Sequence, residues 1–279
     1  MKQETLDETV KRLNTQAKTA RILVLVHLGI TLAALVLLIV LRQIWIPLAV
    51  LVAGVLFYVF AVRTGNQKYS EALAEANLRN GLCGELEEVT FQAADGVDRE
   101  LLRRWAVLPV TEKLRSRSTV SGRKDAVRYF GSEVTTQDLA GTLLTAEADR
   151  SPRPGDWLLL REELLGDDAL ARFLAEYGYR PGAALLEGWD IFTRTSEERI
   201  PDDTAIRILS LTDEAKFLSA LRLAPEGAAA FLKNRFYTGT LRGALTEHAL
   251  RMNTLPERDA IWAFFRWWLN AEEKPEENS

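Results

Sequence analysis

Cysteine is almost absent from this sequence: Cys83 is the only one in 279 residues. A single thiol cannot form an intramolecular disulfide, and it cannot build a zinc site from several thiolates. A chain without disulfides suits a reducing compartment. As a nucleophile Cys83 would need a base, and its neighbours in the sequence supply none, so we expect it to be a small side chain without a chemical role.

Histidine is also scarce, with only His27 and His248. Because His27 lies in a long apolar run, Ser–His–Asp catalysis elsewhere would depend on His248 alone. Glycine-rich phosphate loops, the H-E-x-x-H and G-x-S-x-G motifs and the EF-hand loop are missing. Adjacent acidic residues are common but typical of a solvated surface, and "LLGDDAL" predicts at most a weak cation site. The sequence therefore predicts no cofactor and no metal ion. The acidic pairs are Glu162–Glu163, Asp167–Asp168, Glu197–Glu198 and Asp202–Asp203.

A continuous basic stripe, which a nucleic-acid-binding protein would need, is missing as well. The formal net charge is −4. The most basic segment is "EKLRSRSTVSGRKDAVR", and acidic neighbours dilute it. A solvated loop is one interpretation; contact with anionic lipid headgroups or phosphates is the other. The candidate lipid contacts are Lys113, Arg115, Arg117, Arg123 and Lys124.

What the sequence has in abundance is apolar residues near its start. About 20 such residues cross a bilayer as a helix. Residues 22–41 and 44–62 are two runs of this kind, separated only by Arg42 and Gln43. Pro47 falls in the first turn of the second run, where a missing N–H costs little. We expect a two-span transmembrane hairpin over residues 22–63, since a buried hairpin of a soluble protein normally keeps one polar face and a signal peptide has a shorter core.

Basic residues predict the orientation of this hairpin. They flank its outer ends, whereas the turn has only Arg42, so the positive-inside rule places both termini and the soluble part in the cytosol. Small residues at four-residue spacing, Gly29 with Ala33 and Ala49 with Ala53, predict close packing of one span on the other. A seam between two copies of the chain is the alternative. The flanking basic residues are Lys2, Lys11, Arg12, Lys18, Arg21, Arg63, Lys68 and Arg79.

Two polar helices are expected beside the spans. Residues 1–21 carry apolar side chains at helical spacing, and this amphipathic helix either lies on the membrane or pairs with the helix that leaves the second span. That helix, residues 64–80, is expected to continue the second span into the cytosol, and Asn80-Gly81 ends it.

Residues 81–270 predict an α+β domain with a mainly antiparallel sheet and flanking helices, in one or two subdomains. Strand and helix signals alternate here without a regular βαβ rhythm. Strands are expected within 87–96, on both sides of 122–125, at 157–160 and at 189–195, with an edge strand or hairpin at 235–245. Helices are expected at 98–108, 211–223 and 256–270, and a disordered tail at 271–279.

The segment "IWAFFRWWLN", residues 261–270, crowds five aromatic side chains onto one helix. Positions 261, 264, 265 and 268 form a stripe at helical spacing, which favours packing in a core. Trp262 and Trp267 fall beside or outside this stripe. Because tryptophan is enriched at binding hot spots and at membrane interfaces, these two residues are the candidate partner contacts, Trp267 above all.

The order of elements also resembles a family of bacterial membrane-anchored proteins of unknown function. The hairpin is followed by "VTFQAADGVDRELLRRWAVLP", "VSGRKDAVRYFGSEVTTQD" and "GDWLLLREEL", and Gly122, Val127, Glu133, Gly155 and residues 158–160 match the family's pattern. The "DWLLL" strand departs from the aromatic-rich strand usual there. The resemblance implies a location in the bacterial inner membrane and an accessory role beside other membrane proteins; it implies no activity.

The sequence thus predicts a membrane-anchored, non-enzymatic binding or scaffold module with a protein partner or a second copy of itself. The alternative is a membrane-tethered, hydrolase-like enzyme that uses Cys83, His248 or scattered carboxylates. A lipid-sensing module built on residues 113–128 is a third hypothesis.

Overall fold

The structure is a computed structural model of the full chain. It describes residues 6–40, 44–82, 86–92, 96–111, 114–124, 126–136, 139–148, 153, 155–161, 164–183, 186–197, 199–233 and 255–269. The described chain forms two compact units, a helical unit within residues 1–76 and a unit built on a sheet from residue 77 onward. Each unit is described by itself.

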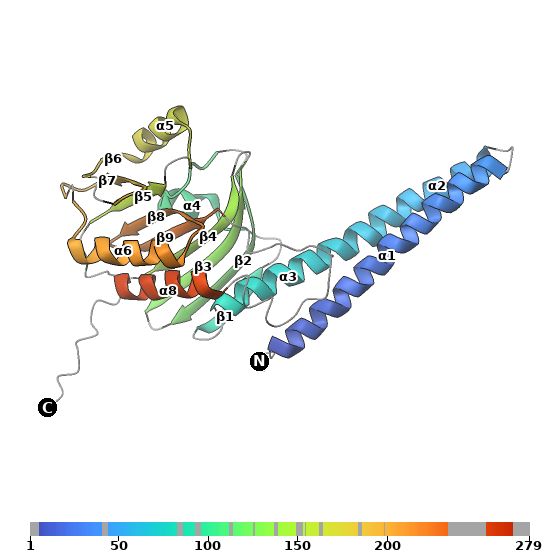
Figure 1. The fold of residues 1–279 in the computed structure, drawn as a ribbon, viewed down its shortest axis with the longest axis horizontal. Coiled ribbons are helices and arrows are strands. Elements are labelled where there is room, and N and C mark those ends of the chain that lie inside the picture. Colours follow the sequence, from blue (N-terminus) through green and yellow to red (C-terminus); the bar gives the residue numbers. More distant parts are fainter. Residues whose placement is uncertain are drawn as a thin grey trace. The chain divides into compact units, whose positions relative to one another are not determined.

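The helical unit is a hairpin of two long helices, α1 (Leu6–Val40) and the segment that starts with α2 (Trp45–Phe57) (Figure 1). The second helix passes through a π-helical turn, η1 (Tyr58–Arg63), into α3 (Thr64–Leu82). This continuity confirms the expectation that a helix extends the second apolar run. Both helices are long and apolar enough to cross a membrane. Their apolar side chains are largely exposed, which is unlike the buried helices of a soluble core.

The two helices pack along a seam that continues beyond the apolar runs. In the polar section, Val10, Leu13 and Ala17 of α1 pack against α3. Of the two alternatives for the amphipathic N-terminal segment, the structure thus shows pairing with the helix that leaves the second run. The residues that α3 contributes to this cluster are Tyr69, Leu73 and Ala76.

Within the apolar section, Gly54 of α2 and Ile30 of α1 make the close approach. A Cβ atom built on Gly54 would lie 3.2 Å from Cγ2 of Ile30, so glycine allows the helices to meet. Ala34 of α1 is buried in this region. The small residues predicted to pack the two runs together are instead exposed on the outside of the hairpin, so that prediction is wrong. These residues are Gly29, Ala33, Ala49 and Ala53.

The second unit contains a nine-stranded sheet in the order β1-β2-β3-β4-β9-β8-β5-β7-β6. All of its strand pairs are antiparallel, which confirms the predicted α+β class with an antiparallel sheet. The strands are β1 (Glu87–Gln92), β2 (Arg115–Lys124), β3 (Val127–Thr135), β4 (Ala140–Glu147), β5 (Trp157–Arg161), β6 (Arg180–Pro181), β7 (Trp189–Thr193), β8 (Leu218–Ala224) and β9 (Gly227–Leu232).

Helices cover both faces of this sheet (Figure 1). Because side chains alternate along a strand, β5 sends Leu158 and Leu160 toward α4 and α5, and Trp157 and Leu159 toward α6 and α8. The central strands are therefore apolar on both sides. The helices are α4 (Arg99–Trp105), α5 (Asp167–Tyr177), α6 (Asp202–Glu214) and α8 (Leu255–Leu269).

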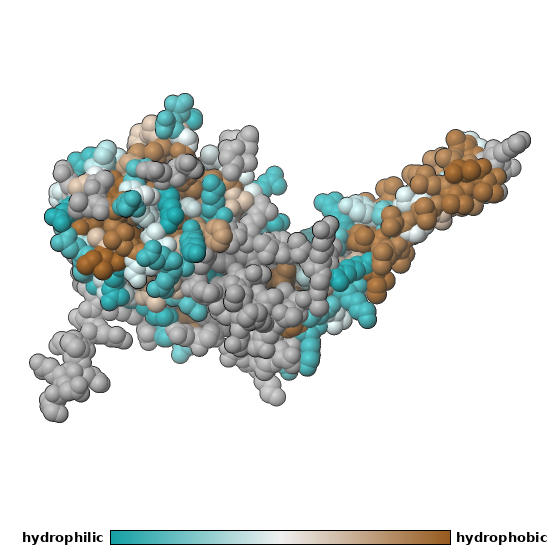
Figure 2. Space-filling view, in the orientation of Figure 1, coloured by the Kyte–Doolittle hydropathy of each residue, from teal (hydrophilic) through white to brown (hydrophobic). Residues whose placement is uncertain are grey.

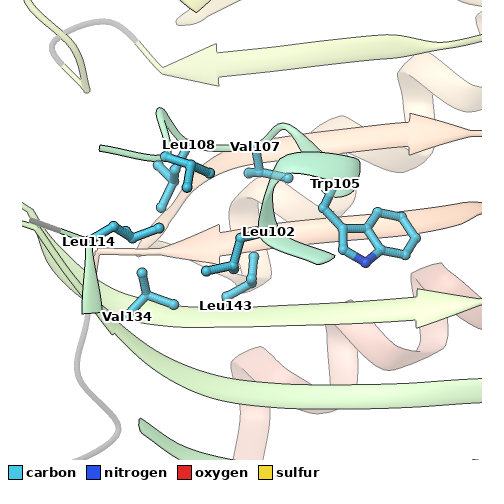
Figure 3. A pocket seen from close by; sticks show the side chains of 8 residues that line it. Leu102, Trp105, Val107, Leu108, Leu114, Val134 and Leu143 are labelled. Carbon is cyan, nitrogen blue, oxygen red and sulfur yellow. The ribbon is translucent and has the colours of Figure 1, made fainter. Parts of the chain in front are cut away.

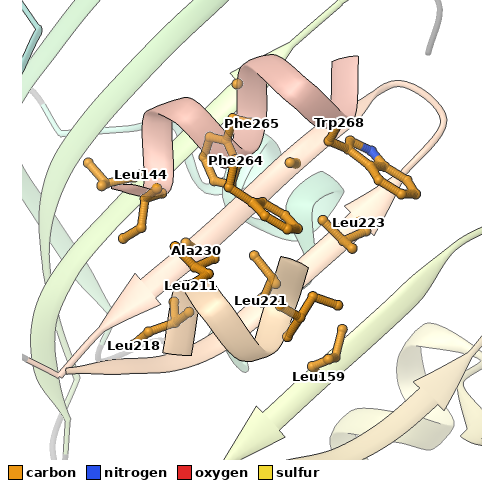
Figure 4. Packing of buried hydrophobic residues seen from close by; sticks show 14 of the residues in the cluster. Leu144, Leu159, Leu211, Leu218, Leu221, Leu223, Ala230, Phe264, Phe265 and Trp268 are labelled. Carbon is orange, nitrogen blue, oxygen red and sulfur yellow. The ribbon is translucent and has the colours of Figure 1, made fainter. Parts of the chain in front are cut away.

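Helix α8 supplies several of the largest side chains of one core (Figure 4). Phe265 and Trp268 are buried over β8 and β9, and the indole Nε1 of Trp268 donates a hydrogen bond to the carbonyl of Ala224 at 3.1 Å. Trp268 also packs edge-on against the ring of Trp157, with centroids 6.1 Å apart. The predicted core stripe of the aromatic helix is thereby confirmed.

The prediction of a helix over residues 211–223 is wrong for most of these residues. Helix α6 ends at Glu214, and residues 218–224 form β8, a central strand buried on both faces. A strand buried on both faces has no polar alternation, so its apolar run was mistaken for a helix face. Thr212, expected at the start of that helix, lies inside α6, where its hydroxyl donates to the carbonyl of Ile208 at 2.8 Å.

Other predicted boundaries agree with the structure. Asp98 is the N-cap of α4 and accepts a hydrogen bond from the backbone N–H of Glu100. The strand at 157–160 corresponds to β5, and the strand at 189–195 to β7. The edge strand expected at 235–245 and the tail at 271–279 lie outside the described residues.

Candidate functional site

The two candidate partner contacts, Trp262 and Trp267, lie in different environments on α8. Trp262 is only 4% exposed and packs edge-on against Tyr129, with ring centroids 5.1 Å apart. A side chain in this position stabilises the core and offers no surface to a partner. Trp267 is half-buried at the border of α8 and α6.

Two arginines cover the indole of Trp267. The guanidinium carbon of Arg153 lies 3.7 Å from the ring centroid and that of Arg207 lies 4.5 Å from it. Arg153 in turn donates a hydrogen bond to Asp203 at 3.0 Å. Although partial burial opposes ionisation of this carboxyl, the bond from Arg153 prevails and lowers the pKa of Asp203. These contacts hold Trp267 beside the first turns of α6.

Next to Trp267, α6 presents apolar side chains to the solvent (Figure 2). Ile206 is 67% exposed, Leu209 43%, and Phe217, in the turn after α6, 49%. Among the described residues outside the hairpin, no other large hydrophobic side chains are exposed. Ile206 and Leu209 are three positions apart and lie on one side of the helix. We call Ile206, Leu209 and Phe217 the α6 face.

Charges of both signs surround the α6 face. Arg207 and Lys216 are exposed beside it, as are Asp213 and Glu214. A surface for nucleic acid or anionic lipid would need mainly basic side chains around it. Apolar side chains inside a mixed polar rim are typical of a contact surface for protein.

The candidate lipid contacts do not form one patch. Lys113 lies outside the described residues, and the other four are spread along β2. Arg117 and Arg123 are six positions apart, which corresponds to about 20 Å along an extended strand. Arg117 is ion-paired to the buried Glu133, with Nε and Oε2 3.0 Å apart. The remaining three are Arg115, Arg123 and Lys124.

The acidic pairs have a structural explanation in two cases. Asp167 and Asp168 lie in the first turn of α5, and Asp202 and Asp203 in the first turn of α6. Negative side chains at this end interact favourably with the helix dipole. The described residues contain no group of three or more metal-ligating His, Cys, Asp or Glu side chains. Cys83 and His248, the candidates for catalysis, lie outside the part of the chain that the structure describes.

Two hollows lined entirely by described residues lie beside the sheet, and both are small. The first lies under α4 and is lined by apolar side chains, among them Leu102, Trp105 and Leu143 (Figure 3). Its free volume of about 10 Å³ has room for one water-sized sphere, so it is a packing defect. The second is an open groove of about 190 Å³ between α4 and the strands β1 to β3, lined by residues such as Thr90, Asp98 and Ser121. Sites for drug-sized ligands usually measure about 300 Å³ or more.

Sequence analysis missed a buried polar cluster on the α4 side of the sheet. Arg222 of β8 is fully buried and pairs with Asp156, which directly precedes β5. Its Nη1 donates to the backbone carbonyls of Arg104 and Trp105, at the end of α4. Arg194 lies 3.6 Å from the same carboxylate. The only indication of this cluster in the sequence is Arg222, the single charged residue in the apolar run of β8.

The α6 face was missed too, and here a signal was present. The buried positions of α6, Thr204, Ile208 and Leu211, already form a stripe at helical spacing. Ile206 and Leu209 are also apolar but lie outside that stripe, so α6 has more apolar side chains than its buried side uses.

Comparison with known proteins gives little further information. No protein-family model and no curated protein matches the chain, so the resemblance to a bacterial membrane-anchored family stays a prediction. Among solved structures, the chain is similar to the mycobacterial trehalose monomycolate transport factor A, with 11% identity and a TM-score of 0.39 over 72% of this chain and 95% of that one. This similarity is too weak to carry an argument.

Proposed function

We propose that the chain is a non-enzymatic, membrane-anchored module whose soluble domain binds another protein through the α6 face. The hairpin anchors the domain, since its apolar helices expose side chains that suit a lipid environment. The basic residues at the outer ends of the hairpin support a cytosolic location of the soluble domain. The bacterial inner membrane is the location that the family resemblance implies.

The observation that carries the proposal is the exposure of Ile206, Leu209 and Phe217. A domain that has covered both faces of its sheet with helices has no packing reason to leave these three in water. Trp267, held beside them by Arg207, is expected to lie at the border of the contact. The mixed rim of Arg207, Lys216, Asp213 and Glu214 matches a protein surface with an apolar stripe and charges of both signs.

The test is crosslinking in intact cells, followed by purification of the full chain in mild detergent and mass spectrometry. The variant Ile206→Ser/Leu209→Ser removes the apolar stripe without touching the core. Its matched control is Ala171→Ser/Ala175→Ser, two exposed positions on α5. A partner that is lost in the α6 variant and kept in the control supports the proposal. A partner kept in both, or a chain that is monomeric and without partners, contradicts it.

A further inference from the structure

The open groove between α4 and the strands β1 to β3 is large enough for a small molecule. Its free volume is about 190 Å³, whereas a water molecule takes up about 30 Å³ in the liquid. Side chains from one helix and three strands line it, and they are exposed or half-buried, so a ligand can reach them from the solvent. The chemistry of this lining limits what the groove can bind.

The strand register places the polar side chains of the groove on one face of the sheet. Thr90 of β1 pairs with Ser121 of β2, which pairs with Phe130 of β3. Gln92 of β1 pairs with Thr119 of β2 in the next row. Side chains directly opposite each other lie on the same face about 5 Å apart, and the next row follows after about 7 Å. The floor of the groove therefore presents three hydroxyls, an amide and an aromatic ring side by side.

The polar groups of this floor offer both donors and acceptors to a ligand. The hydroxyls of Thr90 and Ser121 lie 2.7 Å apart, and only one of them donates in the bond between them. The O–H of the other can therefore donate to a ligand. Thr119 donates its own proton to Oγ of Ser132 at 3.3 Å, so toward a ligand its hydroxyl accepts. The amide of Gln92 can do both.

Asp98 is the only charged side chain in the lining. One of its oxygens caps α4 by accepting the backbone N–H of Glu100 at 3.3 Å, and the exposed carboxylate has further acceptor positions. No lysine or arginine lines the groove, which disfavours an anion; Arg123 and Arg128 lie one row further along β2 and β3. An ammonium ion would match Asp98 but, having donors only, would leave the donors of the floor, such as the amide of Gln92, without an acceptor.

We infer that the groove binds one uncharged sugar ring or a polyol of similar size. Each hydroxyl of such a molecule both donates and accepts, so it can match the mixed lining of the groove. The C–H faces of the ring can pack on Phe130 and on Leu101 of α4, which are apolar walls beside a few polar groups. A free sugar and the terminal sugar of a larger molecule present the same ring. This site is separate from the α6 face and independent of it.

The experiment is saturation-transfer NMR on the full chain in micelles of an amine-oxide detergent, which has no sugar in its headgroup. The probes are glucose, galactose, mannose and myo-inositol. We expect at least one of them to bind saturably with a Kd of about 1–10 mM, and neither sodium acetate nor tetramethylammonium chloride to compete with it. The methyl glycoside of the tightest sugar distinguishes the two sources: equal affinity assigns the terminal sugar of a larger molecule, and a tenfold loss assigns a free sugar.

Three variants test the lining residues. Thr90→Val and Ser121→Ala each remove one hydroxyl, and we expect each to weaken sugar binding about fivefold, the equivalent of one neutral hydrogen bond. Asp98→Asn keeps a side chain that can cap α4 but removes the charge, and should weaken binding about tenfold. Thr111→Val, at an exposed position outside the groove, is the matched control and should bind as the wild type does.

Absence of saturable binding of all four probes at about 100 mM would overturn the inference and leave the groove to water. Equal affinity of the wild type, Thr90→Val and Asp98→Asn for the sugar would overturn it as well, because binding would then take place elsewhere. Competition by acetate or by tetramethylammonium at the same concentration would assign the groove to an ion instead. If Asp98→Asn lowers the melting temperature, Thr90→Val and Ser121→Ala decide the matter alone.

Discussion

Arg222 and Asp156 form a bidentate ion pair inside the soluble domain, with Nε 3.1 Å from Oδ1 and Nη2 3.0 Å from Oδ2. The same guanidinium donates to two carbonyls at the end of α4. It therefore connects the central strand β8, the start of β5 and a helix on one face of the sheet. Burial alone would lower the pKa of Arg222, but the bonds to Asp156 raise it and keep the arginine charged.

Replacing Arg222 by methionine should destabilise the protein severely. The change leaves Asp156 and two backbone carbonyls without their donor, and removal of one member of a buried ion pair costs about 3–5 kcal/mol. The measurement is urea unfolding of the full chain in micelles, followed by near-ultraviolet circular dichroism of the tryptophans. Arg172→Ala, at an exposed position of α5, should stay within about 0.5 kcal/mol of the wild type. Equal stability of the two variants would show that the pair does not hold α4 in place.

The two neighbouring tryptophans of α8 should differ in their effect on stability. Trp268→Ala removes a buried ring and its hydrogen bond to Ala224, and large-to-small changes of this kind cost about 3–5 kcal/mol. Trp267→Ala removes a half-buried ring and two cation–π contacts, for which we expect about 1–2 kcal/mol. The same unfolding experiment measures both. A larger loss for Trp267→Ala would contradict the assignment of Trp268 to the core.

The apolar runs, the antiparallel sheet and the aromatic stripe of α8 could be predicted because each depends on a local pattern. A run of about 20 apolar residues or a 3.6-residue period is visible in any window of the sequence. Strand β8 could not be predicted, since burial on both faces removes the alternation that marks a strand. The outward position of Gly29 was missed because spacing alone does not say which face of a helix meets its neighbour.

The candidate site was less predictable than the fold. Trp267 was singled out from its place beside a stripe, but its arginine partners come from residues 153 and 207, far away in the sequence. Convergence of this kind is decided by tertiary packing. The contacts of Arg194 with the rings of Tyr177 and Tyr179 are a similar case, since they form only after β7 pairs with β6 in the sheet.

The packing of the hairpin can be tested with cysteine pairs in a Cys83→Ser background. Ile30→Cys with Gly54→Cys should form a disulfide within one chain on mild oxidation, because a Cβ atom on Gly54 would lie 3.2 Å from Cγ2 of Ile30, the position that the sulfur of a cysteine can occupy. Gly29→Cys with Gly54→Cys is the control and should form none, since Gly29 has no neighbour within 4 Å. Mass spectrometry of the oxidised protein identifies the bond. Efficient bonding of the control pair instead would place the other face of α1 against α2.

Single cysteines in the same background test the predicted orientation in the membrane. Trp45→Cys, at the start of α2, should react with a membrane-impermeant maleimide added to cells whose inner membrane is intact. Thr19→Cys, exposed on α1, should react only after that membrane is permeabilised. The reverse labelling pattern would place the soluble domain outside the cytosol.

The most direct test of the central claim is a photo-activated crosslinking amino acid at position Leu209, in the full chain in living cells. The matched control is the same amino acid at Ala175 on α5. A binding module that uses the α6 face predicts a discrete crosslinked species of another protein from position 209, lost when Ile206→Ser is added, and none from position 175. Equal crosslinking from both positions, or crosslinks from position 209 to lipid alone, would contradict the proposed function.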